Sequence, residues 1–392
     1  MSSQPPHLPA GVHWIDTPAG LSEAISRMAA GGELAIDTEA DSYYAYRVKV
    51  CLIQVSSRTE DWLIDPLAGL DLRPFGALCA DPSIRKVFHA ASNDVALLRQ
   101  LDGFAFTNLF DTMVAAQVLG LRRPGLAALL LERFGVEQKK TFQTSDWSKR
   151  PLTDGQLHYA AADTRYLLRL KDQFEAELRS VGRVDEAAED FVRLCDAEQT
   201  ERDFDPDAWQ RAPGALALDP RRIQVLRELF VLRDELAQQR DRAPHRVFRD
   251  DLLVAVAQLC PADRAALRPL QRSAGWQLER DADGVLAAVA RGLAQAPYVR
   301  ERRRGRAIDG DSPLTEREKR VFEALRDWRR ERARLRDVEE SRIATTGTLR
   351  NIARAAEALD RDRLAGVEGL SPFRLREYGD EILAVAARAL VG

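Results

Sequence analysis

The chain has 392 residues, of which 45% are hydrophobic and 30% are charged, a composition typical of globular proteins. A chain of this length is too long for one typical domain, so we expect two or three domains, each with its own core. No apolar run reaches the ~18 residues needed to cross a bilayer, and the first residues, MSSQPPHLPAG, lack the basic and apolar segments of a secretory signal. We therefore expect no membrane insertion and a cytoplasmic location.

The net charge of −3 conceals a difference between the two halves of the chain. Residues 1–200 contain 21 Lys and Arg against 28 Asp and Glu, whereas residues 201–392 contain the other 37 against 33. The acidic half can neutralise metal ions, and the basic half can meet a polyanion. The four cysteines lie far apart without a C-x-x-C pair, so we expect a reducing compartment and neither a disulfide framework nor a cysteine zinc site.

The first part of the chain alternates β-rich and helical segments, which predicts an α/β domain over residues 1–205. Strands are expected at residues 33–38, 48–56, 61–65 and 84–89. Helices are expected at residues 94–101, 111–119, 126–134 and 154–177. Thr153 and Gln156 form the sequence signature of a capping box, which indicates where the last of these helices begins.

The second half of the chain reads as helical and contains an internal repeat. A Pro- and Asp-rich segment at residues 199–220 predicts a linker. Beyond it, the pattern of residues 226–237 recurs at residues 322–333, at an offset of 96 positions. We therefore predict two related helical domains, at residues 215–296 and 313–392. The Arg-rich run of residues 300–336 is either a solvated linker and helix face or a contact to an RNA backbone.

Two pairs of residues in the first half have spacings that suggest chemistry. Asp37 and Glu39, at i and i+2 on a predicted strand, point to the same face, and a divalent cation would relieve their mutual repulsion. Their structural alternative is a solvent-facing acidic strand end. Tyr159 and Asp163, at i and i+4, lie one turn apart on one face of a predicted helix. Asp94 follows the strand that ends at His89, where it could simply cap a helix.

Together and in this order, the three segments resemble the three motifs of the DEDD superfamily of 3′-to-5′ exonucleases, in the subtype with Tyr in the third motif. The surrounding sequences VCLIQVSS, FDTMVAAQVLG and SDWSKRPLTDGQLHYAAADTRYLL are more similar still to the ribonuclease D family. The two repeats resemble HRDC domains. The resemblance covers almost the whole chain and implies a ribonuclease H-like exonuclease domain, a mixed sheet flanked by helices, followed by two small all-α HRDC-like domains.

The resemblance also implies the roles of five residues. Asp37, Glu39, Asp94 and Asp163 are expected to hold two divalent cations, Mg²⁺ or Mn²⁺, because every proposed ligand is a carboxylate. Tyr159 is expected to orient or deprotonate the attacking water. The implied activity is that of a monomeric 3′-to-5′ exoribonuclease that trims tRNA precursors and other small structured RNAs and releases nucleoside 5′-monophosphates. A DNA 3′-to-5′ exonuclease and a non-catalytic nucleic-acid adaptor are the alternatives.

Four further residues are candidates for substrate binding. His89 could contact a metal-bound water or the scissile phosphate, or it could be a structural histidine. Trp147, Lys149 and Arg150 precede the helix that carries Tyr159, where they could stack on a base or hold a phosphate. The alternative for Trp147 is packing in the interior of the domain.

Overall fold

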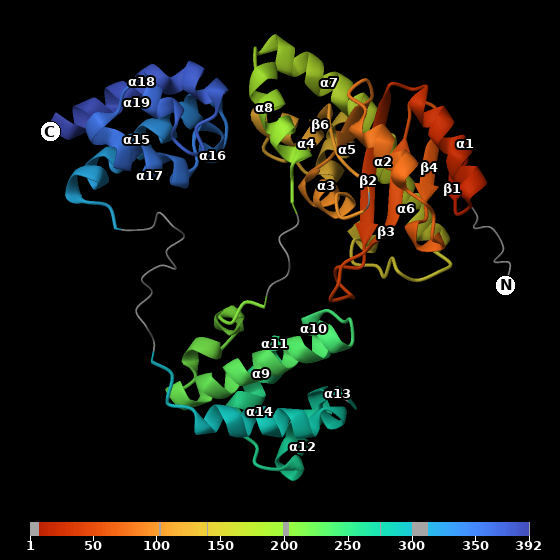
Figure 1. Ribbon diagram of the computed structural model, residues 1–392, viewed down its shortest axis with the longest axis vertical. Coiled ribbons are helices and arrows are strands. Elements are labelled where there is room, and N and C mark those ends of the chain that lie inside the picture. The colour runs from red at the N-terminus through yellow and green to blue at the C-terminus, as the bar shows by residue number, and fades with distance from the viewer. Residues whose placement is uncertain are drawn as a thin grey trace. The chain divides into compact units, whose positions relative to one another are not determined.

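The computed structural model describes residues 8–101, 103–138, 140–198, 204–274, 276–299 and 313–391. The chain divides into two compact units (Figure 1). One unit comprises residues 1–39, 50–199 and 310–392, and the other comprises residues 40–49 and 200–309. In the described part of the chain, no helix combines the length and the apolar character required to cross a membrane.

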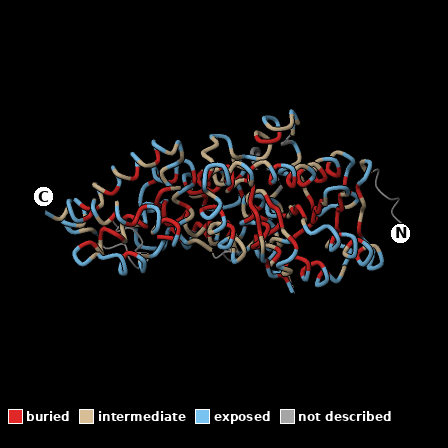
Figure 2. Tube along the Cα trace, turned by 90° about the horizontal axis from the view of Figure 1, so that it is seen from above, coloured by how far each residue is buried: buried red, intermediate tan, exposed pale blue. Residues whose placement is uncertain are grey.

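The first unit is built on a six-stranded mixed sheet, with the strands in the order β1-β4-β3-β2-β5-β6. β1 is parallel to β4, β2 to β5 and β5 to β6, whereas β3 and β4 are antiparallel. β3 and β4 are buried along their whole length. Figure 2 colours the buried residues along the chain red. The strands are β1 Val12–Ile15, β2 Glu33–Ala40, β3 Val50–Ser56, β4 Asp61–Ile64, β5 Arg85–Phe88 and β6 Leu109–Asp111.

Helices pack around this sheet and enclose its hydrophobic core. α6 lies against β3 and β4, α7 against β5, and α8 against β6. These helices are α1 Pro18–Ala29, η1 Pro66–Ala68, α2 Arg73–Ala80, α3 Ser92–Leu98, α4 Thr112–Val118, α5 Leu126–Phe134, η2 Lys140–Phe142, α6 Asp154–Arg165, α7 Leu167–Ser180 and α8 Val184–Cys195. The predicted mixed sheet flanked by helices is confirmed.

α6 begins at the predicted capping box, in which Thr153 and Gln156 satisfy each other's backbone amides. Its buried alanines, Ala160 and Ala161, allow the helix to lie close to β3 and β4. A Cβ at Gly155 would come within 2.5 Å of the Phe142 ring, so a larger residue here would have to displace that ring. One continuous helix over residues 154–177 was predicted, but the structure breaks it at Tyr166 and continues as α7.

The two helical domains repeat the same arrangement. The elements of the first are η3 Ala208–Arg211, η4 Ala215–Ala217, α9 Pro220–Gln239, α10 Pro244–Val247, α11 Asp250–Leu259, α12 Arg264–Ala274, α13 Trp276–Arg280 and α14 Ala282–Ala294. Those of the second are α15 Glu316–Arg336, α16 Glu340–Ile343, α17 Thr346–Ala355, η5 Ala356–Ala358, α18 Arg361–Ala365 and α19 Pro372–Val391. α9, α10 and α11 each begin 96 positions before α15, α16 and α17, which is the offset of the sequence repeat.

A buried arginine explains part of this repeat. Arg233 donates to the carbonyl oxygen of Phe248, and the equivalent Arg329 donates to that of Ala344, both at 3.2 Å. Because each guanidinium satisfies a backbone carbonyl where the chain turns between two helices, the position cannot readily become apolar. The repeat therefore preserves a polar link as well as hydrophobic contacts.

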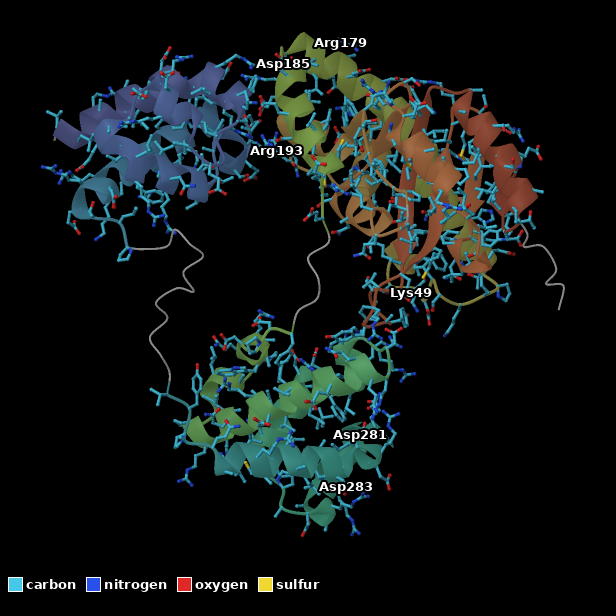
Figure 3. The ribbon with its side chains drawn as sticks, viewed as in Figure 1. Lys49, Arg179, Asp185, Arg193, Asp281 and Asp283 are labelled. Atoms are coloured by element: carbon cyan, nitrogen blue, oxygen red, sulfur yellow. The ribbon has the colours of Figure 1, made fainter. Side chains whose placement is uncertain are left out.

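Within the first unit, the second helical domain contacts α8 through ion pairs. Arg336 binds Glu186 at 2.7 Å, and Arg342 binds Asp190 at 2.6 Å. Asp185 and Arg193 lie on the same helix (Figure 3), and Asp185 pairs with Arg376 of α19 at 3.5 Å. The last arginine of the Arg-rich run is thus engaged within the protein. Residues 300–312 of that run lie outside the described residues.

Candidate active site

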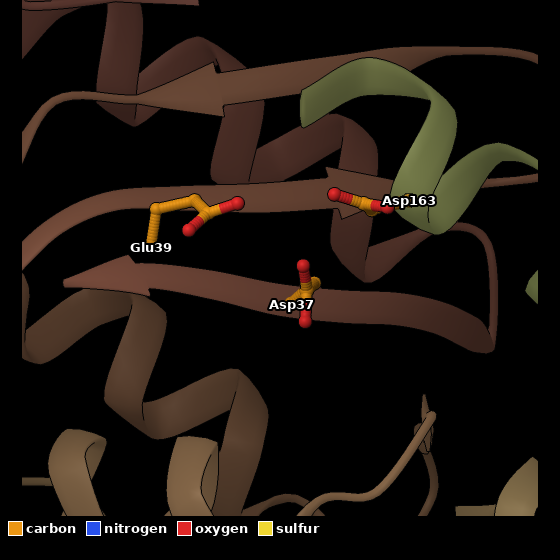
Figure 4. A group of neighbouring side chains, drawn as sticks. All are labelled: Asp37, Glu39 and Asp163. Carbon is orange, nitrogen blue, oxygen red and sulfur yellow. The ribbon is translucent and has the colours of Figure 1, made fainter. Parts of the chain in front are cut away.

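Three carboxylates converge where β2 meets α6. Asp37 and Glu39 come from alternate positions of β2, and Asp163 comes from the side of α6 that faces the sheet. One carboxylate oxygen of each residue lies within 4.8 Å of the others (Figure 4). Such a spacing of oxygen donors suits a hard divalent cation.

Asp94 joins this group through the residue between the two strand carboxylates. Its Oδ1 accepts hydrogen bonds from the Thr38 backbone N–H at 3.1 Å and from the Thr38 hydroxyl at 2.6 Å. Helix α3 begins after Ala91 without a side-chain cap, so the alternative of Asp94 as the cap of that helix is not realised. Asp94 is instead directed towards β2.

Burial and mutual repulsion shift the carboxyl groups of this cluster towards their protonated forms. Burial, reinforced by the charges of Asp163 and Asp94, raises the pKa of Glu39 to about 9. Burial is also the main cause that raises the pKa of Asp94 and that of Asp163 to about 7. The pKa of Asp37 lies well above its usual range for the same two reasons. A cluster that resists ionisation in this way gains most from a bound cation.

Tyr159 lies one turn before Asp163 and is half-buried. Its ring is 5.9 Å from the ring of Phe142 and 6.2 Å from that of Trp147, which together hold it in place. Burial and the nearby carboxylates raise the pKa of the phenol, so its hydroxyl stays protonated at neutral pH. Tyr159 therefore presents a neutral hydroxyl to the cavity beside the cluster.

The cluster opens into a cavity of about 850 Å³. One wall is apolar and comes from α5, and it includes Leu131, which is 46% exposed. Polar groups line the rest, among them Arg123, Gln138 and Gln143. Gln138 donates a short hydrogen bond to Asp163. The sequence analysis did not single out these residues. The only local feature that could have indicated one of them is the pair of adjacent cations, Arg122 and Arg123, before a proline.

His89 lines the same cavity, at the end of β5. Burial lowers its pKa to about 4 in spite of the nearby Asp111 carboxylate, so the imidazole is neutral at physiological pH. A neutral ring supplies no positive charge to a phosphate. The structure thus supports a position in the cavity for His89 but not a cationic contact.

The structure does not support the predicted substrate contacts before α6. Trp147 is only 1% exposed and packs in the cluster that holds Tyr159, so it is not placed to stack on a base. Arg150 pairs with Asp65 at 2.7 Å and donates to the carbonyl oxygen of Cys51. Lys149 is exposed and lies 3.5 Å from Asp146. Of the two alternatives for Trp147, the structure realises packing in the interior, and Arg150 is engaged by partners within the protein.

Known families and proteins are similar to this chain in sequence. A model described as a 3′-5′ exonuclease matches residues 12–179, and a model of the HRDC domain matches residues 222–289 and 318–386. Ribonuclease D of Nitrobacter hamburgensis is 35% identical over 289 residues, which cover 72% of this chain and 74% of that protein. Exosome complex exonuclease RRP6 of Saccharomyces cerevisiae is 31% identical over 64% of this chain and 36% of its own length.

Solved structures show the same architecture. The catalytic core of RRP6 from Trypanosoma brucei has a TM-score of 0.67 at 26% identity and covers 74% of this chain and 83% of its own. Escherichia coli RNase D, described as an exoribonuclease involved in structured RNA processing, shares the fold with a TM-score of 0.63 at 24% identity, over 96% and 99% of the two chains. With the 35% identical relative, these matches show that the chain belongs to the ribonuclease D family and is a 3′-to-5′ exoribonuclease.

Proposed function

We propose that this exoribonuclease trims the 3′ ends of tRNA precursors and other small structured RNAs and releases nucleoside 5′-monophosphates. The observation that carries the chemistry is the convergence of Asp37, Glu39 and Asp163 beside Asp94 and Tyr159. The substrate class rests on membership of the ribonuclease D family.

The donor set fits divalent cations. Two such cations, Mg²⁺ or Mn²⁺, would be held by Asp37, Glu39, Asp94 and Asp163. All four side chains are carboxylates, whose negative charges repel one another when no cation is bound. When bound, such ions supply an acidified water and stabilise negative charge at a phosphodiester. The raised pKa values support this assignment, because four crowded carboxyl groups without cations would not all ionise near neutral pH.

In this proposal Tyr159 orients the attacking water through its hydroxyl oxygen. A protonated phenol can both donate and accept a hydrogen bond, so it can fix the direction of a water molecule without taking up a charge. Its ring is held by Phe142 and Trp147, which keeps the hydroxyl beside Asp163. The packing of Trp147 thus serves the site indirectly.

The walls of the cavity suit the last nucleotide of a single strand. Arg123 is a cation that can bind a phosphate, and the exposed Leu131 offers an apolar surface to a base. The carboxylates of Asp37, Glu39 and Asp163 line the same cavity as Arg123 and Leu131. This arrangement supports binding of a 3′ end rather than of an internal segment.

Degradation of labelled substrates tests the proposal. A tRNA precursor with a 3′ extension, a single-stranded RNA and a DNA of the same sequence, all labelled at the 5′ end, are incubated with Mg²⁺, Mn²⁺ or EDTA. We expect a ladder of shortened RNA products that EDTA abolishes, with nucleoside 5′-monophosphates as the small product. Asp37→Asn is the matched control and should lower turnover by ~10³-fold. Internal fragments, or equal turnover of DNA, would contradict the proposal.

A further inference from the structure

The hydrogen bonds of His89 fix which of its two ring nitrogens carries the proton. Nδ1 of His89 lies 2.9 Å from the hydroxyl oxygen of Thr112, and that hydroxyl donates to the carbonyl oxygen of Phe88 at 3.0 Å. A hydroxyl has a single proton, so once Thr112 donates to the carbonyl it can only accept from the imidazole. Nδ1 of His89 is therefore the protonated nitrogen, and Nε2 of the neutral ring carries a lone pair.

The backbone around His89 is held as firmly as its ring. Asp111 is fully buried, and its carboxylate accepts the backbone N–H groups of Ala90 and Ala91, at 3.2 and 2.7 Å. The same carboxylate caps α4. Ala90 has a φ of +63°, a conformation that a residue with a side chain adopts only when its surroundings hold it there. Asp111 thus fixes the position of the backbone next to His89, and Thr112 fixes the tautomer of its ring.

An imidazole in this tautomer offers the cavity a hydrogen-bond acceptor and no donor. It cannot hydrogen bond to a phosphate oxygen, which is itself an acceptor. With divalent cations bound, the carboxyl groups of Asp37 and Glu39, which share the cavity, would be ionised and would act only as acceptors, so this part of the site requires donors from whatever binds. The hydroxyl groups of a terminal sugar are the donors that the end of an RNA strand carries next to its last phosphate.

We propose that Nε2 of His89 accepts a hydrogen bond from a hydroxyl group of the 3′-terminal sugar, which makes His89 a specificity-determining residue. If the partner is the 2′-hydroxyl, the contact favours RNA over DNA. If it is the 3′-hydroxyl, the contact recognises a free 3′ end. The inference rests on the 3′-to-5′ exoribonuclease activity and adds a sugar contact to it.

Substrates that differ in one hydroxyl test this assignment. Three RNAs of one sequence, ending in ribose, 2′-deoxyribose or 3′-deoxyribose, are compared by kcat/KM for removal of the last nucleotide. For the wild type we expect a loss of about fivefold with one of the two deoxy ends, the effect of one hydrogen bond. His89→Phe keeps a ring of similar shape without the acceptor, and it should abolish this difference.

Thr112 gives a second pair of variants that leaves the imidazole in place. Thr112→Val removes the group that holds the proton on Nδ1, so the preference should weaken, whereas Thr112→Ser keeps the hydroxyl and should retain it. If His89→Phe slows all three substrates by the same factor, the histidine acts on water or on a cation and the proposal is wrong.

A binding experiment separates this inference from the activity. The affinities of adenosine 5′-monophosphate and its 2′-deoxy and 3′-deoxy forms are measured by calorimetry in Mg²⁺, for the wild type and for His89→Phe. We expect the wild type alone to discriminate against the same deoxy form as in the kinetics. Equal discrimination by both proteins would overturn the proposal, even if RNA degradation proceeds as expected.

Discussion

The hydroxyl of Thr38 donates to the carboxylate of Asp94 at 2.6 Å, and the Thr38 backbone N–H donates to the same oxygen. Thr38 lies between Asp37 and Glu39 on β2, whereas Asp94 is on α3, so this pair links two of the three acidic segments directly. One oxygen of Asp94 is thereby oriented, and in the proposed arrangement the other binds a cation.

Removal of this link should disturb the geometry of the cluster without removing a carboxylate. For Thr38→Val we expect kcat to fall by ~10-fold, because a hydrogen bond to a charged group is worth about 1.5–3 kcal/mol and one of the two bonds to Asp94 is retained. Thr38→Ser keeps the hydroxyl and should stay close to the wild type. Turnover of a short single-stranded RNA at saturating Mg²⁺ measures both variants, and equal rates for the two would show that the link is dispensable.

Tyr159→Phe should separate the positioning of water from the binding of cations. The variant keeps the ring and its packing against Phe142 and Trp147 but loses the hydroxyl. We expect kcat to fall by roughly 10²–10⁴-fold, the range of one positioning or acid–base group. Mg²⁺ affinity, followed by calorimetry, should remain that of the wild type. A large loss of Mg²⁺ affinity would instead assign Tyr159 to the groups that hold the cation.

The sequence predicted the part of the site that depends on local periodicity. The alternation of a strand puts Asp37 and Glu39 on one face, and the helical repeat puts Tyr159 next to Asp163, as the structure has them. The contact between Asp94 and Thr38 joins residues 56 positions apart, so no local pattern could reveal it. The choice between packing and base stacking for Trp147 stayed open for the same reason, because its burial depends on the distant strands β3 and β4.

The fold shows the same division between local and distant information. The capping box at Thr153 was found because it depends on neighbouring residues, and the repeat was found because its two copies are similar in sequence at a constant offset. β1 and β6, the strands at the two edges of the sheet, were missed. The end of α6 at Tyr166 also escaped, because the helical pattern of the sequence continues without interruption into α7.

The pH dependence of stability should reveal the crowded carboxyl groups. In the folded, cation-free protein the pKa of Glu39 is raised from 4.5 to about 9, and those of Asp94 and Asp163 from 3.8 to about 7. The folded state therefore binds more protons than the unfolded state in this range. The resulting stability is fully present below pH ~4 and is lost as the pH rises through about 7 to 9.

Thermal unfolding in EDTA between pH 5.5 and 9 measures this effect. Tm of the wild type should fall with increasing pH, and saturating Mg²⁺ should reduce that fall because the cation replaces the protons. Glu39→Gln cannot ionise and should flatten the slope. The exposed Glu235→Gln is the control and should leave the slope unchanged. If Glu39→Gln had the wild-type slope, Glu39 would not be protonated in the cation-free protein.

Glu186 on α8 should be critical for the attachment of the second helical domain. It is 2% exposed, and its carboxylate binds Arg336 at 2.7 Å and lies 3.7 Å from Arg342. Glu186→Ala would leave the largely buried Arg336 without its carboxylate, whereas Arg342 keeps Asp190. Loss of one partner costs about 3–5 kcal/mol in comparable buried pairs. We expect faster proteolytic release of the second helical domain and a lower midpoint of urea unfolding.

Glu357→Ala is the matched control, since Glu357 and its partner Arg317 are both 69% exposed and such pairs contribute about 0–1 kcal/mol. Equal stability of the two variants would show that the ion pairs on α8 do not hold the helical domain.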